Sequence, residues 1–89
     1  MPVISTFYGI YIFLYYADTR KHHRPHIHVQ YGEFEAVVDI EEGDILEGDI
    51  PKSRMRLVQA WIEIHRQELK DDWQLAVSGR KPFQITPLI

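Results

Sequence analysis

The chain has 89 residues, of which 45% are hydrophobic, so residues 1–89 are expected to form a single domain with a modest core. The absence of cysteine excludes a disulfide framework and a thiolate metal site, and it is consistent with a cytoplasmic protein. The net charge of -3 argues against a generally basic nucleic-acid binder. The apolar run 10–16 is far shorter than the roughly 20 residues of a membrane span, so we expect no membrane segment.

The first predicted strand covers residues 9–16 (GIYIFLYY), because β-branched and aromatic residues suit a pleated sheet. Residues 3–7 are either a short strand of their own or the start of this one. Successive side chains point to opposite faces of a strand, and this run does not alternate in polarity, so both faces should be covered. One face would hold Ile10, Ile12 and Leu14, and the other would hold Tyr11, Phe13 and Tyr15.

Residues 26–39 predict a hairpin with the two-residue turn Gly32-Glu33, since a type II′ turn takes glycine at its first central position. On one side this register places Tyr31 opposite Phe34, Val29 opposite Ala36, and Ile27 opposite Val38. On the other side it places Gln30 opposite Glu35, His28 opposite Val37, and His26 opposite Asp39. A slip of one residue would mix apolar and polar groups on both faces, so the pattern strongly favours this register.

The remainder of the chain predicts a turn, a short strand and a helix. Residues 41–44 form the turn and residues 45–47 the strand; Pro51 marks a helix start, and Gly79 is the expected residue after the helix end. A break near Arg66 or Gln67 stays open. One apolar stripe at helical spacing comprises Met55, Val58, Trp61, Ile62, His65, Leu69, Trp73 and Ala76. We therefore predict an α+β fold, an antiparallel β-meander of about four strands with one long amphipathic helix packed on one face. Residues 83–86 could add an edge strand.

Four of the five histidines lie in residues 22–28, and the His-x-His pair is the clearest candidate for chemistry. Two imidazoles on one strand face, His26 and His28, can chelate a divalent metal such as zinc, with Asp39, His22 or His23 as a third ligand. Without a metal, His26, His28 and Asp39 could act as catalytic acid and base on a phosphodiester. A structural or partner-contact role is the alternative to both. His65, within the apolar stripe, is expected to be a core histidine bonded to a backbone carbonyl or a tyrosine hydroxyl.

The charges are unevenly distributed, since residues 33–49 contain eight acids and no base. The candidate binding cations are Arg20, Lys21 and Arg24 in a predicted loop over residues 18–24, and Lys52, Arg54 and Arg56 at the helix start. The helix dipole disfavours cations at that end, so a counter-charge is expected nearby. It is either the acidic segment itself or a phosphate or acidic partner, and the second alternative would make the protein a nucleic-acid-binding regulator.

The aromatic side of the first strand is expected to face away from the helix. There, Tyr11, Phe13 and Tyr15 would form an exposed patch, and large apolar patches on small domains usually mark a partner surface. Tyrosine and histidine are suited to interfaces with a polar edge. We therefore expect this face to form a homodimer or to bind another protein.

Four stretches of the sequence, in this order and spacing, resemble a known family almost end to end. They are MPVISTFYGIYI, RPHIHVQYGEFEAVVDI, ILEGDIP and LVQAWIEIHRQELKDDWQLA. They resemble the small prokaryotic family catalogued as domain of unknown function 4160, which often has a double proline where this chain has Arg24-Pro25. The resemblance implies a cytoplasmic bacterial or archaeal protein.

The same resemblance implies a protein partner. Genes of the family tend to neighbour those of a second small uncharacterised family, in an arrangement that looks like toxin and antitoxin pairs. Our first hypothesis is therefore a partner-binding component of a two-gene, toxin-antitoxin-like module. A small metal-dependent or histidine-based hydrolase, ribonuclease-like, and a nucleic-acid-binding regulator are the alternatives.

Overall fold

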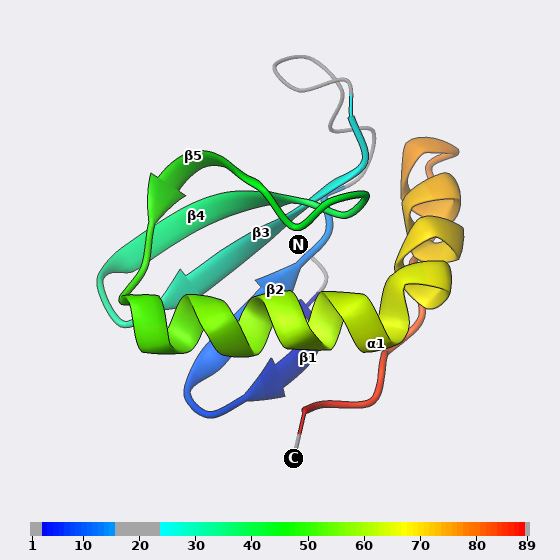
Figure 1. Cartoon of the computed structure of the whole chain (residues 1–89). Helices are drawn as coiled ribbons and strands as arrows, with labels where there is room; N and C mark the ends of the chain where they lie inside the picture. Colours follow the sequence, from blue (N-terminus) through cyan, green and yellow to red (C-terminus); the bar gives the residue numbers. More distant parts are fainter. Residues whose placement is uncertain (1–2, 16–23, 89) are drawn as a thin grey trace.

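The structure, a computed structural model of the chain, describes residues 3–15 and 24–88. Within these residues, five strands form one antiparallel sheet in the order of the sequence, and one helix follows them (Figure 1). The elements are β1 (Val3–Phe7), β2 (Ile10–Phe13), β3 (His26–Tyr31), β4 (Phe34–Asp39), β5 (Ile45–Asp49) and α1 (Lys52–Val77). The predicted α+β meander is confirmed. Residues 3–7 form a strand of their own, so the sheet has five strands instead of about four.

The predicted register of the β3–β4 hairpin is confirmed at every position. His26 pairs with Asp39 and His28 pairs with Val37, and the turn between the strands begins at Gly32. The backbone φ of Gly32 is 58°, the positive value that the first central position of a type II′ turn requires. The alternating polarity of the two strands and the glycine in the turn were therefore enough to predict how β3 pairs with β4.

Strand β2 begins at Ile10, one residue later than the composition predicts, because residue 9 belongs to the turn between β1 and β2. Tyr8 and Gly9 have φ values of 50° and 77°, and the flanking Phe7 and Ile10 pair directly. Two consecutive positive φ values are typical of a type I′ hairpin turn. Gly9 thus belongs to the turn, and β2 begins at Ile10.

The two ends of α1 lie where proline and glycine predict them. Pro51 precedes the first helical residue, and Gly79 follows the last turn with a φ of 80°. The Arg80 amide donates to the Leu75 carbonyl at 2.8 Å, and the Gly79 amide donates to the Ala76 carbonyl at 3.0 Å. This pair of bonds is a Schellman motif, which satisfies carbonyls left free at the helix end.

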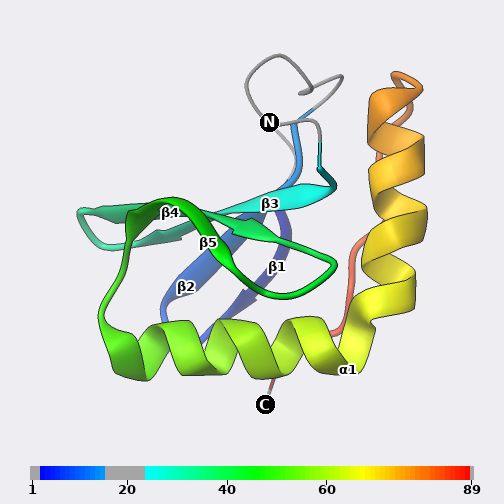
Figure 2. The ribbon, with the colours of Figure 1, turned by 45° about the horizontal axis from the view of Figure 1, so that its top comes forward.

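Helix α1 is bent within its length. His65 has non-helical backbone angles, with φ -111° and ψ 22°, one residue before the open break position at Arg66. The first part of α1 lies across one face of the sheet, and the second part turns away and passes the end of the sheet (Figure 2). The predicted bonding partner of His65, a backbone carbonyl or a tyrosine hydroxyl, is wrong. The His65 side chain is 14% exposed and lies beside Trp61, and its Nδ1 lies 2.5 Å from the Glu68 carboxylate.

The core lies between the sheet and the first part of α1, and Trp61 is its largest fully buried side chain. The remaining predicted stripe residues are also buried, together with Asp72, which the stripe did not include. Charged side chains interrupt α1, and no helix in the described part of the chain has an apolar stretch that could cross a bilayer.

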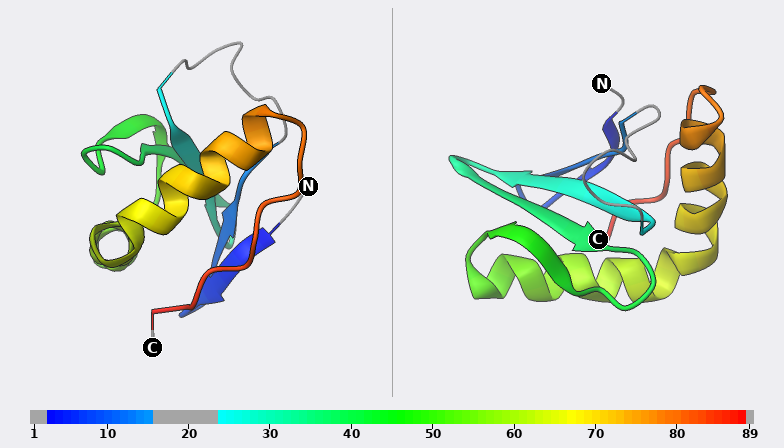
Figure 3. Two further views of the ribbon diagram at one scale, coloured as in Figure 1. Left: turned by 90° about the vertical axis from the view of Figure 1, so that its right-hand side faces the viewer. Right: turned by 90° about the horizontal axis from the view of Figure 1, so that it is seen from above.

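The C-terminal tail runs along β1 and covers the edge of the sheet (Figure 3). The Ile85 amide donates to the Ile4 carbonyl at 2.8 Å, and the Gln84 side chain donates to the Val3 carbonyl at 2.6 Å. Residues 83–86 do not form a regular strand, but they occupy the edge where one was predicted. The tail is also tied to the helix, because the Trp61 indole donates to the Thr86 carbonyl at 2.9 Å.

Asp72 makes the stability of the fold depend on pH. Its carboxylate is buried, with Oδ1 accepting the Phe83 amide at 2.9 Å and Oδ2 unpartnered. Burial raises the pKa of Asp72, the Phe83 bond opposes this, and Glu68 and Asp71 add to the rise. The folded state therefore binds the proton more tightly than the unfolded chain does. Stability declines as pH rises from the ordinary aspartate pKa of about 3.9 through the higher folded value, and it stays lower above that value.

We expect Asp72→Asn to be more stable than the wild type at pH 7, because the amide oxygen still accepts the Phe83 N–H and no charge is buried. The advantage should shrink as the pH falls through the raised folded pKa toward about 4, and it should not change further below that pH, where the aspartate is neutral in both states. Thermal unfolding followed by circular dichroism across this range measures it. Glu33→Gln, at an exposed position in the β3–β4 turn, is the control. An Asp72→Asn protein that is destabilised equally at every pH would contradict the expectation.

Candidate functional site

The sheet face opposite the first part of α1 carries one continuous row of side chains. Antiparallel pairing aligns Phe13 of β2 with His28 of β3, His28 with Val37 of β4, and Val37 with Glu47 of β5. The neighbouring row, in the same way, is Tyr11, Gln30 and Glu35. Because alternate residues share a face, we define the open face by these two rows and Tyr15.

Two adjoining hollows form a groove across the open face. One, of about 280 Å³, is lined by Phe13, Tyr15, His28, Val29, Gln30, Glu35, Ala36, Val37, Glu47 and Gly48. The other, of about 430 Å³, is lined by Val3, Tyr11, Phe13, Gln30 and Gly32. Phe13 and Gln30 belong to both hollows, so the groove reaches from β1 to β5.

Aromatic rings form much of one wall of the groove. The rings of Phe13 and Tyr15 stack with centroids 6.3 Å apart, and the Tyr15 ring meets the His28 ring edge-on at 4.2 Å. Tyr11 is 49% exposed, whereas the aliphatic residues of the same strand are fully buried on the helix side. The predicted division of β2 into an aliphatic and an aromatic face is confirmed. The role of the aromatic face in binding stays a prediction.

His26 lies beneath the surface, although the hairpin register turns it away from the first part of α1. Its side chain is 1% exposed, its Nδ1 donates to the Arg24 carbonyl at 2.7 Å, and its ring lies 5.3 Å from the His28 ring. The Trp73 ring, from the second part of α1, lies 4.9 Å away. The helix bend, which the sequence left open, therefore brings a tryptophan onto His26.

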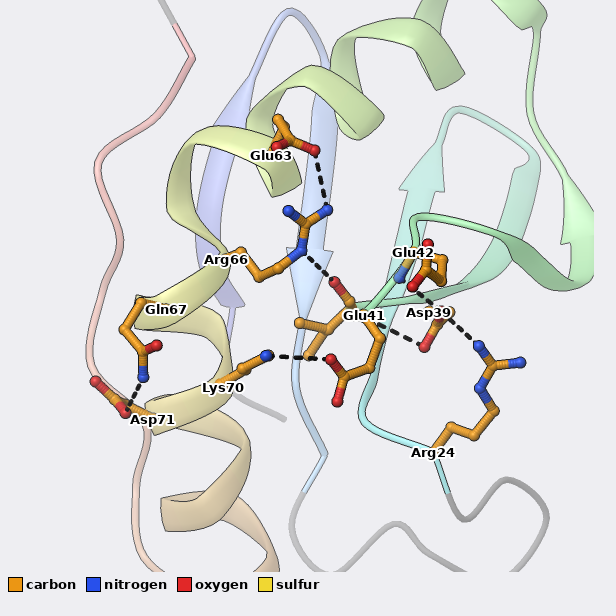
Figure 4. Close-up of polar contacts among 10 residues, drawn as sticks. Arg24, Asp39, Glu41, Glu42, Glu63, Arg66, Gln67, Lys70 and Asp71 are labelled. Carbon is orange, nitrogen blue, oxygen red and sulfur yellow. Dashed lines mark hydrogen bonds and ion pairs between the residues drawn. The ribbon is translucent and has the colours of Figure 1, made fainter.

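Asp39 is opposite His26, as the register predicts, but its carboxylate also serves the surrounding loops. The side chain is 0% exposed and accepts the Arg24 guanidinium at 2.8 Å. It also accepts the Glu42 amide at 2.8 Å and the Glu41 amide at 3.3 Å (Figure 4). One buried carboxylate thus holds the entry to β3 and the turn after β4 together.

The predicted use of His26, His28 and Asp39 as ligands or catalysts stays untested. Of the three, only His28 lines the groove. Within residues 3–15 and 24–88, no group of three His, Cys, Asp or Glu side chains is placed to hold a metal ion. The other two predicted ligands, His22 and His23, lie outside the described residues. The described geometry therefore lends the zinc hypothesis no support.

The predicted binding cations are divided between separate places. Arg24 is paired with Asp39, while Arg20 and Lys21 lie outside the described residues. Arg54 lies over the Tyr31 ring, 5.1 Å from its centroid. The other two residues at the helix start, Lys52 and Arg56, line a hollow between β5 and α1 that also includes Asp49. Nucleic-acid binding by these residues stays a prediction.

A polar network holds the second part of α1 against the turn after β4 (Figure 4). Lys70 pairs with Glu41 at 3.1 Å, and the Arg66 Nε donates to the Ile40 carbonyl at 3.2 Å. Arg66 also bonds Glu63 at 3.0 Å, which lowers the pKa of Glu63 and raises that of Arg66. Lys70 therefore neutralises one carboxylate of the acidic segment, whereas the predicted counter-charge of Lys52, Arg54 and Arg56 stays a prediction. These long-range contacts had no local signal in the sequence.

The family described as Domain of unknown function (DUF4160) matches residues 9–74. The match includes β2 to β5, most of α1 and every groove residue except Val3. No curated protein and no solved structure matches the chain.

Proposed function

The chain belongs to the DUF4160 family, which has no assigned activity, and from the geometry of the groove we propose that it is a partner-binding protein. In this proposal it is the binding component of a two-gene, toxin-antitoxin-like module, and the groove receives a segment of the protein encoded by the neighbouring gene. The observation that supports it is the groove itself, which crosses all five strands of the sheet.

The composition of the groove suits a protein segment. Exposed and half-buried aromatic rings, here Tyr11, Phe13 and Tyr15, are the side chains that most often anchor protein interfaces. His28 and Gln30 add hydrogen-bonding groups beside those rings. The opposite face of the sheet is covered by α1, so the open face is where the sheet can receive an additional layer.

The charge of the groove favours a different protein over a second copy of this chain. Glu35, which lines it, is exposed and makes no ion pair within the described part of the chain, and no lysine or arginine is among the described lining residues. A two-fold symmetric dimer places the same patch of both subunits together, so it would bring the Glu35 carboxylates of the two subunits close to one another. Like charges across an interface weaken binding.

We expect Tyr11→Ala to weaken binding to the neighbouring gene product by about 10-fold or more, because an interfacial aromatic side chain is lost. Tyr8→Ala is the matched control, since Tyr8 is similarly exposed, at 53% against 49%, but lies in the β1–β2 turn outside the groove. Isothermal titration calorimetry with the co-expressed, separated proteins measures both affinities.

Three results would contradict the proposal. The neighbouring gene product shows no binding at micromolar concentration, or both tyrosine variants bind it as the wild type does. Alternatively, light scattering shows a dimer of this chain that Tyr11→Ala dissociates. A ribonuclease activity that His28→Ala abolishes without unfolding the protein would favour the hydrolase hypothesis in its place.

A further inference from the structure

The end of the sheet beside the start of α1 carries exposed aromatic rings together with cations of the helix. We infer that this end is a second binding surface, which takes a single-stranded nucleic acid. Its bases stack on Tyr8 and Phe34, and its backbone phosphates contact Lys52 and Arg54. With Tyr31, these four residues make up what we call the basic–aromatic surface. None of the five lines the groove, so the inference goes beyond the proposed function and does not depend on it.

The order of the strands gathers the basic–aromatic surface from three separate segments. In an antiparallel meander every second connection lies at the same end of the sheet, so the β1–β2 turn, the β3–β4 turn and the junction of β5 with α1 share one end (Figure 1). Tyr31 lies at the centre of this end. It pairs with Ile10 and Phe34 on the neighbouring strands, and a Cβ atom on Gly9 would lie 3.2 Å from its ring. The Arg54 guanidinium lies over the same ring, 5.1 Å from the centroid.

Two aromatic rings of this surface are open to solvent. Tyr8 is 53% exposed and Phe34 is 50% exposed. The tight β1–β2 turn holds Tyr8 at a φ of 50°, an uncommon value for a residue other than glycine. Exposed aromatic rings are the platforms on which single-stranded nucleic acids stack their bases, and losing one such ring typically weakens binding by about 10-fold.

The cations at the start of α1 have no carboxylate partner among the described residues. Lys52, Arg54 and Arg56 make no ion pair within residues 3–15 and 24–88, and the Arg54 Nε is buried without a hydrogen-bond partner there. The first turn of α1 contains no acidic residue, and the helix dipole disfavours cations at this end. These cations therefore cost the helix stability, and no ion pair in the described part of the fold offsets that cost. A phosphate is the counter-charge that such cations bind.

Two carboxylates at the same end limit the electrostatic attraction. Glu33 is exposed in the β3–β4 turn, and Asp49 lines a hollow with Lys52 and Arg56. Against the three cations at the helix start, the two carboxylates leave an excess of one positive charge, in a chain whose net charge is -3. Stacking must therefore supply much of the binding. This requirement favours unpaired bases over a duplex, whose bases are already stacked, and over an acidic peptide without rings.

The first test measures binding of the full chain to labelled oligonucleotides by fluorescence anisotropy. The oligonucleotides have about 12 residues, within the about 4–16 nucleotides that small single-strand-binding domains cover, and are made as RNA and as DNA to show which strand is preferred. We expect single strands to bind at least about 10-fold more tightly than the duplex of the same sequence or a polyglutamate peptide of equal charge. Tyr8→Ala and Phe34→Leu should each weaken binding by about 10-fold, whereas Tyr8→Phe, which keeps the ring, should bind as the wild type does.

Charge variants test the phosphate contacts separately. Lys52→Gln should weaken binding and reduce the slope of log affinity against log salt by about 0.7, the value for one phosphate of a single strand. Lys81→Gln is the matched control, because it removes an exposed lysine beyond the opposite end of α1. Glu33→Gln should strengthen binding by about 2-fold, since it removes an opposing charge from the same end.

Three results would overturn the inference. They are no binding of either single strand at low salt, equal affinity for the duplex or the polyglutamate peptide, and equal losses in Lys52→Gln and Lys81→Gln. The proposed function is tested apart from this surface, because Tyr11→Ala should impair binding of the protein partner alone and Phe34→Leu binding of the nucleic acid alone. Circular dichroism confirms that each variant is folded.

Discussion

Trp61→Ala is expected to lower the free energy of unfolding by about 3–5 kcal/mol, because large-to-small changes in a core remove contacts and leave a cavity. Trp61 is 0% exposed, and its ring lies 5.4 Å from the Phe7 ring. Its indole N–H holds the tail at the Thr86 carbonyl. A small domain has a total stability of about 5–15 kcal/mol, so this one change would remove a large part of it.

Urea unfolding followed by circular dichroism measures the effect of this change. Trp61→Phe should lose less, because it keeps most of the aromatic volume and removes chiefly the hydrogen bond to the tail, worth about 0.5–1.5 kcal/mol, and part of the ring. Ile64→Ala is the control on the same helix. Ile64 is 64% exposed, so a change within about 0.5 kcal/mol is expected. A loss at Trp61 no larger than at Ile64 would mean that the core does not centre on this residue.

Gly48→Ala is expected to lower the free energy of unfolding by about 2–5 kcal/mol, for two separable reasons. Gly48 has a φ of 70°, and holding an alanine in this left-handed region costs about 1–2 kcal/mol. The new methyl group would also lie 2.3 Å from the Glu35 carbonyl oxygen, a backbone atom that moves only if β4 and β5 separate, and overpacking of this kind costs about 1–3 kcal/mol.

Gly32→Ala separates these two contributions. Gly32 has a comparable φ of 58°, but a Cβ atom there would have no neighbour within 4 Å. We therefore expect Gly32→Ala to lose only the conformational part, about 1–2 kcal/mol. Equal losses at both glycines in urea unfolding would show that the close approach of β5 to β4 contributes nothing. Gly48→Ala should in addition weaken partner binding more than Gly32→Ala, because it displaces β5, which forms one end of the groove.

Four residues of the groove were recognisable before the structure was known. Tyr11, Phe13 and Tyr15 share a face by strand periodicity, and the hairpin register brings His28 to the side opposite the apolar pairs. Gly48 was not recognisable, because its importance comes from the distance between two backbones, which no local pattern reports. That Glu47 lines the same hollow as Glu35 required the alignment of β4 with β5.

The amino-acid sequence by itself determined the register of the β3–β4 hairpin, the helix ends and the division of β2, β3 and β4 into two faces. These depend on neighbours along the chain or across one short turn: alternating polarity, Gly32 in its turn, and Pro51 and Gly79 at the helix boundaries. Such signals act over a few residues, so periodicity and turn chemistry are enough to predict them.

Only the tertiary structure decided where the second part of α1 lies and which histidine remains accessible. The bend at His65 is accompanied by contacts distant in sequence, Lys70 with Glu41 and Arg66 with the Ile40 carbonyl. It places Trp73 against His26, so that His26 is buried while His28 lines the groove. The two histidines are alternate residues of one strand and share its face, so the sequence pattern alone predicts the same burial for both. The difference in their burial comes from long-range packing.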